Sequence, residues 1–184
     1  MIVRKDLQYF QHVHPDFDPA TGEFSISLQL PAEGPYRFFA DFTSGDSGLE
    51  VTSIQDVVAG SDQLPTVVLK PSSSFAVDGY KVDLVSKPAQ VHVGDEAIFT
   101  FALTKDGKPI TGLDPYLGAF GHAIILHENT LDFIHTHPID YLASSGQVIF
   151  HAQMEQLGNY KIFAQFKHQG KLLTTEFVVS VVAK

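Results

Sequence analysis

One segment of this chain occurs twice, and this repeat restricts the fold more than any other feature of the sequence. Residues 34–42 read Gly-Pro-Tyr-Arg-Phe-Phe-Ala-Asp-Phe, and residues 158–166 read Gly-Asn-Tyr-Lys-Ile-Phe-Ala-Gln-Phe. Five positions are identical at a constant offset of 124 residues, among them the tyrosine and the last phenylalanine. A repeat of this length predicts two copies of one structural unit in tandem.

Each copy also contains a His-x-His-Pro motif. The motifs are residues 12–15 and 135–138, and each begins two positions after a phenylalanine, Phe10 or Phe133. Their offset is 123, so the second copy holds one residue more between the motif and the repeated segment. In a β-strand, residues i and i+2 point to the same face. Both histidines of a motif can therefore reach one small target, such as a metal ion.

Alternation of apolar and polar residues predicts that both copies are built from β-strands. No stretch of ten or more residues has the period of an amphipathic helix. The alternating runs are residues 24–30, 36–42, 98–103, 148–154, 160–166 and 177–181. Turn sequences separate these runs, as expected for short antiparallel strands. We therefore predict an all-β protein made of immunoglobulin-like antiparallel β-sandwich units.

The boundary between the copies is predicted within residues 70–74, Lys-Pro-Ser-Ser-Ser. It divides the chain into a truncated β-sandwich unit, residues 1–75, and a complete immunoglobulin-like β-sandwich, residues 76–184. The first copy has no counterpart of residues 80–122, and the counterpart of His122 would precede Met1. We therefore expect the chain to begin inside a repeat, because an N-terminal segment was lost or because its start was set at an internal methionine.

An incomplete first unit is expected to expose apolar side chains and unpaired strand edges. The residues concerned are Phe24, Ile26, Phe38 and Phe42. Three covers are conceivable: the second unit, a second copy in a homodimer, or a missing N-terminal segment. We expect packing on the second unit together with self-association, because two-fold dimers are the commonest soluble assemblies.

Three histidines of the second unit are expected to form a metal site. Residues 121–126 and 131–135 would pair as a hairpin. His122 would then lie opposite His135, or opposite His137 if the register shifts by two residues. In both registers the three histidines share one sheet face, where opposed Cβ atoms are about 4.5–5.5 Å apart. Three neutral imidazoles suit a copper ion most and a zinc ion next. The predicted function is therefore metal binding in metal homeostasis.

Other residues are weaker candidates for the same site. His12 and His14 lack a visible third partner, and His168, near a turn, could supply a fourth ligand. Asp114 is expected either to stabilise a turn or to accept a hydrogen bond from a residue that binds the metal. A three-histidine site could also activate water, but no carboxylate is obviously placed as a general base.

A competing interpretation needs no metal. In it, the two units form a structural or protein-interaction module, and the histidines only donate and accept hydrogen bonds. His92 and His127 are expected to be solvated under either interpretation. Substitution of the His-x-His pair distinguishes the metal-site interpretation from the interaction-module interpretation, because only the metal-site interpretation predicts a loss of metal binding.

The composition excludes several other functions. With 12 basic and 21 acidic residues the net charge is −9, which disfavours nucleic acid as a partner. The chain has no cysteine, so disulfides, thiolate metal sites and thiol catalysis are excluded. No apolar stretch approaches the roughly 20 residues of a membrane span. There is no phosphate-binding glycine loop or nucleophile elbow, and we predict no enzymatic activity.

Residues 114–122, Asp-Pro-Tyr-Leu-Gly-Ala-Phe-Gly-His, together with residues 131–138, resemble a family of mostly uncharacterised bacterial extracytoplasmic proteins. Residues 34–42 share the resemblance. It implies tandem immunoglobulin-like modules, a role in copper or heavy-metal homeostasis, and a periplasmic or secreted location. A metal-transport protein would then be a partner. This chain departs from the family pattern because it lacks the N-terminal strands and a signal peptide.

Overall fold

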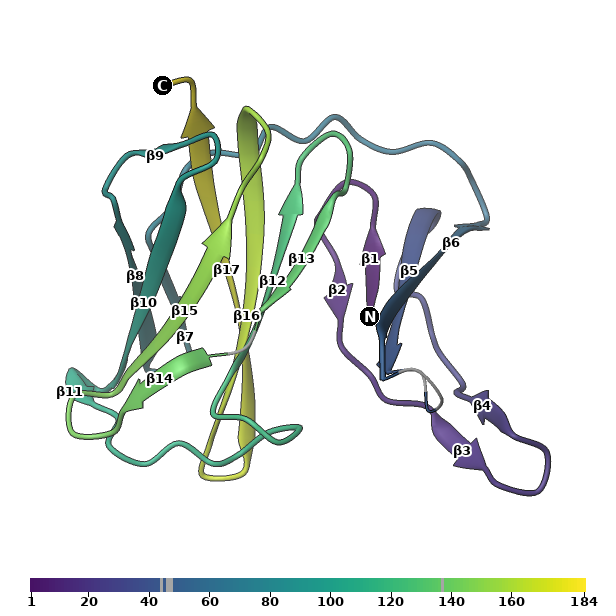
Figure 1. The fold of residues 1–184 in the computed structure, drawn as a ribbon, viewed down its shortest axis with the longest axis horizontal. Coiled ribbons are helices and arrows are strands. Elements are labelled where there is room, and N and C mark those ends of the chain that lie inside the picture. The colour runs from purple at the N-terminus through teal and green to yellow at the C-terminus, as the bar shows by residue number, and fades with distance from the viewer. Residues whose placement is uncertain (44, 46–47, 137) are drawn as a thin grey trace. The chain divides into compact units, whose positions relative to one another are not determined.

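The computed structural model describes residues 1–43, 45, 48–136 and 138–184, and these form strands, turns and loops without a helix (Figure 1). The all-β class predicted from the alternating pattern is confirmed. The described residues divide into two compact units, Met1–Val67 and Val68–Lys184. None of them belongs to a helix that could cross a membrane.

The division lies before the polar segment in which the boundary was predicted. Ser72 explains why this segment belongs to the second unit. Its backbone N–H donates to the carbonyl oxygen of Val178 at 3.0 Å, and its Oγ accepts from the Val178 N–H at 3.1 Å. Both bonds tie the segment to the last strand of the chain.

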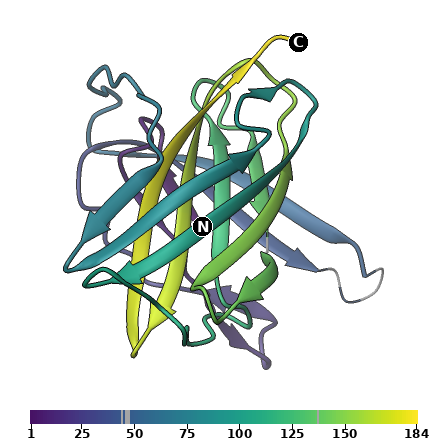
Figure 2. The same ribbon diagram turned by 90° about the vertical axis from the view of Figure 1, so that its left-hand side faces the viewer.

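The second unit is a sandwich of two sheets. Its strands are β7 (Ser74–Val77), β8 (Tyr80–Lys87), β9 (Val91–His92), β10 (Glu96–Lys105), β11 (Lys108–Pro109), β12 (His122–His127), β13 (Phe133–Thr136), β14 (Pro138–Leu142), β15 (Gln147–Gln153), β16 (Gly158–His168) and β17 (Lys171–Val182). One sheet has the order β14-β15-β10-β8-β7, with β11 paired to β10, and the other has the order β13-β12-β16-β17-β9. Figure 2 shows the first of these sheets in front of the second. Among the described strands of this unit, only β9 and β17 pair in parallel.

Phenylalanine rings from both sheets form the centre of the core between them. The ring centroid of Phe101, on β10, lies 5.4 Å from that of Phe150, 5.5 Å from that of Phe166 and 5.4 Å from that of Phe177. All four side chains are fully buried. The alternation in β10 produces this arrangement, because every second residue of a strand faces the same side.

The first unit contains a four-stranded sheet and a separate hairpin. Its strands are β1 (Ile2–Arg4), β2 (Phe10–Gln11), β3 (Asp16–Asp18), β4 (Glu23–Ser25), β5 (Gly34–Thr43) and β6 (Glu50–Ala59). The sheet has the order β2-β1-β5-β6, and β3 pairs with β4.

The strand registers of the first unit repeat those of the second at nearly the same offset as the sequence. The matching Cα pairs are Val3–Phe10 with Leu126–Phe133, Ile2–Phe38 with Ile125–Ile162, Phe17–Phe24 with Tyr141–Val148, and Tyr36–Val57 with Tyr160–Val179. Strands β1 to β6 are therefore the counterparts of β12 to β17. The described residues of the first unit contain no counterpart of β7 to β10.

The expected uncovered apolar surface is present in the first unit. Phe24, Ile26 and Phe42 are exposed by 68%, 44% and 52%, and Phe38 is partly buried. Their counterparts in the second unit are buried in the core that β8 and β10 complete. The difference follows from the absence of these two strands among the described residues of the first unit.

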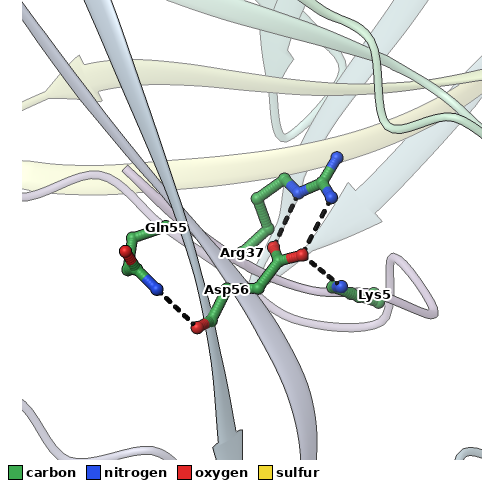
Figure 3. A network of polar contacts seen from close by, with 4 residues as sticks. All are labelled: Lys5, Arg37, Gln55 and Asp56. Carbon is green, nitrogen blue, oxygen red and sulfur yellow. Dashed lines mark hydrogen bonds and ion pairs between the residues drawn. The ribbon is translucent and has the colours of Figure 1, made fainter.

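The opposite face of the first unit's sheet carries an ion cluster (Figure 3). Arg37 and Asp56 are direct cross-strand partners, with Nε to Oδ1 at 2.8 Å and Nη2 to Oδ2 at 3.0 Å. Lys5 donates from Nζ to Asp56 Oδ2 at 2.6 Å. The counterpart of Arg37 is Lys161, which pairs with Glu176 at 2.6 Å. In both units, therefore, a basic residue on one strand (β5 or β16) pairs with an acidic residue on the following strand (β6 or β17).

The ion cluster predicts a pH-dependent contribution to stability. Arg37 and Lys5 hold the pKa of Asp56 well below its usual range. A carboxylate with a lower pKa in the folded state stabilises the protein above its unfolded pKa, and this contribution is lost as the pH falls through its folded pKa. Because the side chain is 43% exposed, we expect at most about 1 kcal/mol.

We expect Asp56→Asn to lower the free energy of unfolding at about pH 7, and the gap from the wild type to shrink below about pH 4. Urea unfolding at several pH values measures this gap. Asp16→Asn, on the exposed β3, serves as the control. A gap for Asp56→Asn that stays constant as the pH falls from about 7 to about 2.5 would contradict the assignment.

Candidate metal centre

His122 is the first residue of β12, and its side chain is held by the loop before the strand. The residue is 3% exposed, and its Nε2 lies 2.8 Å from the backbone carbonyl oxygen of Tyr116. A carbonyl can only accept, so Nε2 carries the proton, and in a neutral ring Nδ1 then holds the lone pair. The Tyr116 ring meets the imidazole edge-on, with centroids 5.9 Å apart. Partial burial of the Tyr116 side chain raises the pKa of its hydroxyl.

A tight turn positions the Tyr116 carbonyl. Tyr116 and Ala119 exchange two backbone hydrogen bonds, at 2.8 and 3.1 Å. The two residues between them have positive φ, 48° at Leu117 and 86° at Gly118. Positive φ at both central positions is the pattern of a type I′ turn. Leucine adopts this conformation at a cost of about 1–3 kcal/mol, which the surrounding structure must offset.

Gly121 allows β12 to begin close to its neighbour β16. A Cβ atom at this position would lie 2.9 Å from Cε1 of Phe166 and 3.3 Å from the carbonyl oxygen of Gln165. A side chain would therefore push His122 away from the sheet or displace a core ring. This close approach is the physical reason for glycine in the Gly-His motif.

The register of β12 with β13 brings the backbone of His135 close to that of His122. Ile124 pairs with His135, and Ala123 pairs with Thr136. This is the second of the two registers considered for the hairpin, shifted by two residues from the first. Directly opposed residues share a sheet face, and His122 precedes Ile124 by two positions, so His122 and His135 occupy diagonal positions on one face. His137 lies outside the described residues, and of His135 only the backbone pairing is described.

The His-x-His-Pro motif of the second unit lies where the chain changes sheets. Strand β13 ends at Thr136 in one sheet, and β14 begins at Pro138 in the other. Thr136 Oγ1 donates to the carbonyl oxygen of His151 at 2.9 Å, which fastens the end of β13 to β15. The pairing of β14 with β15 shifts between Pro138 and Asp140. Proline suits such an irregular start because it has no N–H to donate to the sheet.

Gln165 lies next to His122 on the neighbouring strand β16, and its side-chain oxygen is unsatisfied. The two residues are Cα partners in the pairing of β12 with β16. Gln165 Nε2 donates to Thr174 Oγ1 at 3.0 Å, whereas its buried Oε1 has no hydrogen-bond partner among the described residues. An unsatisfied buried oxygen costs about 1–3 kcal/mol. This polar group beside His122 fits a bound ion or its water ligand.

The weaker candidates lie elsewhere or have other contacts. His168 Nδ1 lies 3.1 Å from the hydroxyl of Tyr80. Asp114 Oδ2 accepts from the backbone N–H of Gly170 at 2.7 Å, as expected for a residue that stabilises a turn. In the first unit, the rings of His12 and His14 have centroids 5.5 Å apart. In the first unit, where the side chains of the motif are described, the two histidine rings of the motif are therefore neighbours.

His127 is buried, and the expectation that it is solvated is wrong. Its Nε2 donates to the carbonyl oxygen of Leu157 at 3.0 Å, and its Nδ1 lies 3.1 Å from Thr130 Oγ1. The Thr130 contact lies within the turn between β12 and β13, and the Leu157 contact ties this turn to the connection between β15 and β16. Gly158, with a φ of 128°, leaves room for this ring, because a Cβ there would lie 2.9 Å from Nε2. Sequence reasoning missed this role, although the glycine next to a strand start was a usable signal.

Among the described residues, no group of three or more His, Asp or Glu side chains is close enough to hold a metal ion. The predicted triad includes His137, which lies outside the described residues.

The comparisons with known proteins identify a family for the second unit. Residues 75–183, more than half of the chain, match the model of a family described as "Domain of unknown function (DUF8832)". The chain belongs to this family. The matched domain includes His122, His135 and His137 but not the His12–His14 motif. A search of curated proteins finds no match to the chain.

Proposed function

We propose that the second unit binds one copper or zinc ion through His122, His135 and His137. The observation that carries the proposal is the hydrogen bond from His122 Nε2 to the Tyr116 carbonyl. Histidines that bind a metal almost always donate their other ring N–H to a carbonyl or carboxylate, which fixes the tautomer and the ring orientation. Here the bond leaves Nδ1 as the nitrogen that can coordinate.

Two further features support the choice of ligands and metal. The register supports the use of His122 and His135 as joint ligands, because the backbones of these residues occupy diagonal positions on neighbouring strands. The chain offers imidazoles and no thiolate, a set that suits Cu(II) and Zn(II), with copper favoured by the affinity order of divalent ions. A bound ion would also give the buried oxygen of Gln165 a polar neighbour.

We infer further that the sandwich is immunoglobulin-like. The order β14-β15-β10-β8 corresponds to strands D, E, B and A of that fold, and β13-β12-β16-β17 corresponds to C′, C, F and G. The family resemblance adds a non-enzymatic role in metal homeostasis, outside the cytoplasm, with a metal-transport protein as partner.

Titration of the metal-free protein with Cu(II) and with Zn(II) tests the proposal. We expect one ion per chain with a Kd below about 10 μM, equivalent to roughly 7 kcal/mol. Affinity should fall as the pH drops through about 6.5, because imidazole must be neutral to coordinate. Failure of both metals to bind below this Kd would refute metal binding and favour the interaction module.

The interaction module remains a second candidate because of one observation in the first unit. The apolar side chains of Phe24, Ile26 and Phe42 are each exposed by at least 44%, and exposed apolar residues, where they cluster, mark sites of protein interaction. The two functions are compatible, since they concern different units.

A further inference from the structure

We propose that β4 of the first unit pairs with β4 of a second copy of this chain, so that one sheet extends across a two-fold axis. The inference concerns the first unit and does not depend on metal binding by the second. It follows from the matching registers of the two units, which show what normally lies beside β4.

The counterpart of β4 is a strand with neighbours on both sides. In the second unit, β15 lies between β14 and β10. In the first unit, β4 pairs with β3, and no other described strand pairs with it. One edge of β4 therefore presents backbone N–H and C=O groups to any strand that can reach them.

The sequence beyond β4 is ready to form a longer strand. Strand β4 has three residues, whereas β15 has seven. Residues 24–30 nevertheless continue the alternation, Phe-Ser-Ile-Ser-Leu-Gln-Leu. A neighbouring strand would supply the hydrogen bonds that residues 26–30 need to become part of a sheet.

A second copy meets the geometric requirement. β10 pairs with β15 in antiparallel orientation. A two-fold axis perpendicular to a sheet relates two antiparallel copies of one strand, so β4 of the second copy can occupy the place of β10. The resulting order β3-β4-β4-β3 has as many strands as β14-β15-β10-β8.

Side-chain chemistry selects the centre of this pairing. If Ile26 lies opposite its own copy, Phe24 faces Leu28 and Glu23 faces Gln29. The apolar residues then share one side of the sheet, and the glutamates stay apart, which avoids the cost of opposed like charges. Phe150, the counterpart of Ile26, is likewise directly opposite an apolar residue, Phe99 of β10, and both point into the core. The new sheet would cover the exposed rings of Phe24 and Phe42.

Sedimentation analysis or light scattering between about 1 and 100 μM tests the proposal, since dissociation constants in this range correspond to roughly 5–8 kcal/mol. We expect the wild type to be dimeric at the upper end. Ile26→Lys, which places a charge on the apolar side, should weaken association at least tenfold. Val85→Lys is the matched control, because Val85 is 61% exposed on β8. A wild type that stays monomeric, or equal effects of both variants, would overturn the proposal.

Crosslinking locates the interface. The chain has no cysteine, so a single introduced cysteine reports on one position. We expect Ser27→Cys to crosslink between copies with a short bis-maleimide, and Ser144→Cys, in an exposed turn of the second unit, to stay uncrosslinked. A dimer in which Ser27→Cys does not crosslink, or in which Ser144→Cys reacts equally, would refute pairing through β4.

Discussion

Replacing His135 and His137 together by alanine is expected to weaken binding of Cu(II) or Zn(II) at least 100-fold, a loss of about 2.7 kcal/mol or more. The physical reason is the loss of two of the three proposed ligands, after which His122 alone cannot hold an ion. Isothermal titration of both proteins at about pH 7.5, where imidazole is neutral, measures the change. Under the interaction-module interpretation, the same variant would alter only stability, by about 1–3 kcal/mol.

The repeat supplies a matched control for this experiment. His12 and His14 form the same motif in the first unit, where residues 1–67 contain no other histidine. Replacing this pair by alanine should leave the affinity of the second unit's site within about twofold of the wild type. This difference is well under 1 kcal/mol. If both double variants reduced binding equally, the assignment to the second unit would be wrong.

Replacing Phe101 by alanine is expected to cost about 3–5 kcal/mol of the free energy of unfolding. This ring contacts Phe150, Phe166 and Phe177, and its removal would leave a cavity where the two sheets meet. Urea unfolding followed by far-ultraviolet circular dichroism measures the loss. Stabilities of small domains are commonly 5–15 kcal/mol, so the variant would be close to unfolding.

Val85→Ala is the control for this substitution. Val85 lies on the neighbouring strand β8 and is largely exposed, so its truncation should change stability by no more than about 0.5 kcal/mol. A Phe101→Ala protein as stable as Val85→Ala would mean that the aromatic cluster is not the core of the unit.

The sequence was sufficient for the features that depend on periodicity. Alternation at residues 36–42 and 160–166 predicted strands, and β5 and β16 contain these residues. The offset of the repeat also anticipated the matching registers and the exposure of Phe24, Ile26 and Phe42. These features were accessible because side-chain alternation and strand pairing share one period.

Features of the site that depend on local backbone conformation were not predictable. Nothing in the sequence indicates positive φ at Leu117, because leucine rarely adopts it, and this turn positions the carbonyl that binds His122. The register of β12 with β13 was left open between two alternatives, since both placed the histidines on one face. His127 was misjudged for a different reason: a histidine in a turn is usually solvated, and the glycine at the start of β16, which makes room for its ring, was a signal that the prediction did not use.

The short link between β13 and β14 affects how quickly an ion could leave. Thr136 and Pro138 belong to different sheets and are separated by a single residue, whereas four residues separate β15 from β16. A connection this short keeps the two sheets from sliding past each other at that point. The proposed ligand His122 lies on the face of β12 opposite Ala123 and Ile125, which point into the core, so release of an ion from the proposed site would not require the two sheets to separate. Its exchange would proceed by stepwise substitution of ligands, and its rate would depend on the concentration of the accepting molecule.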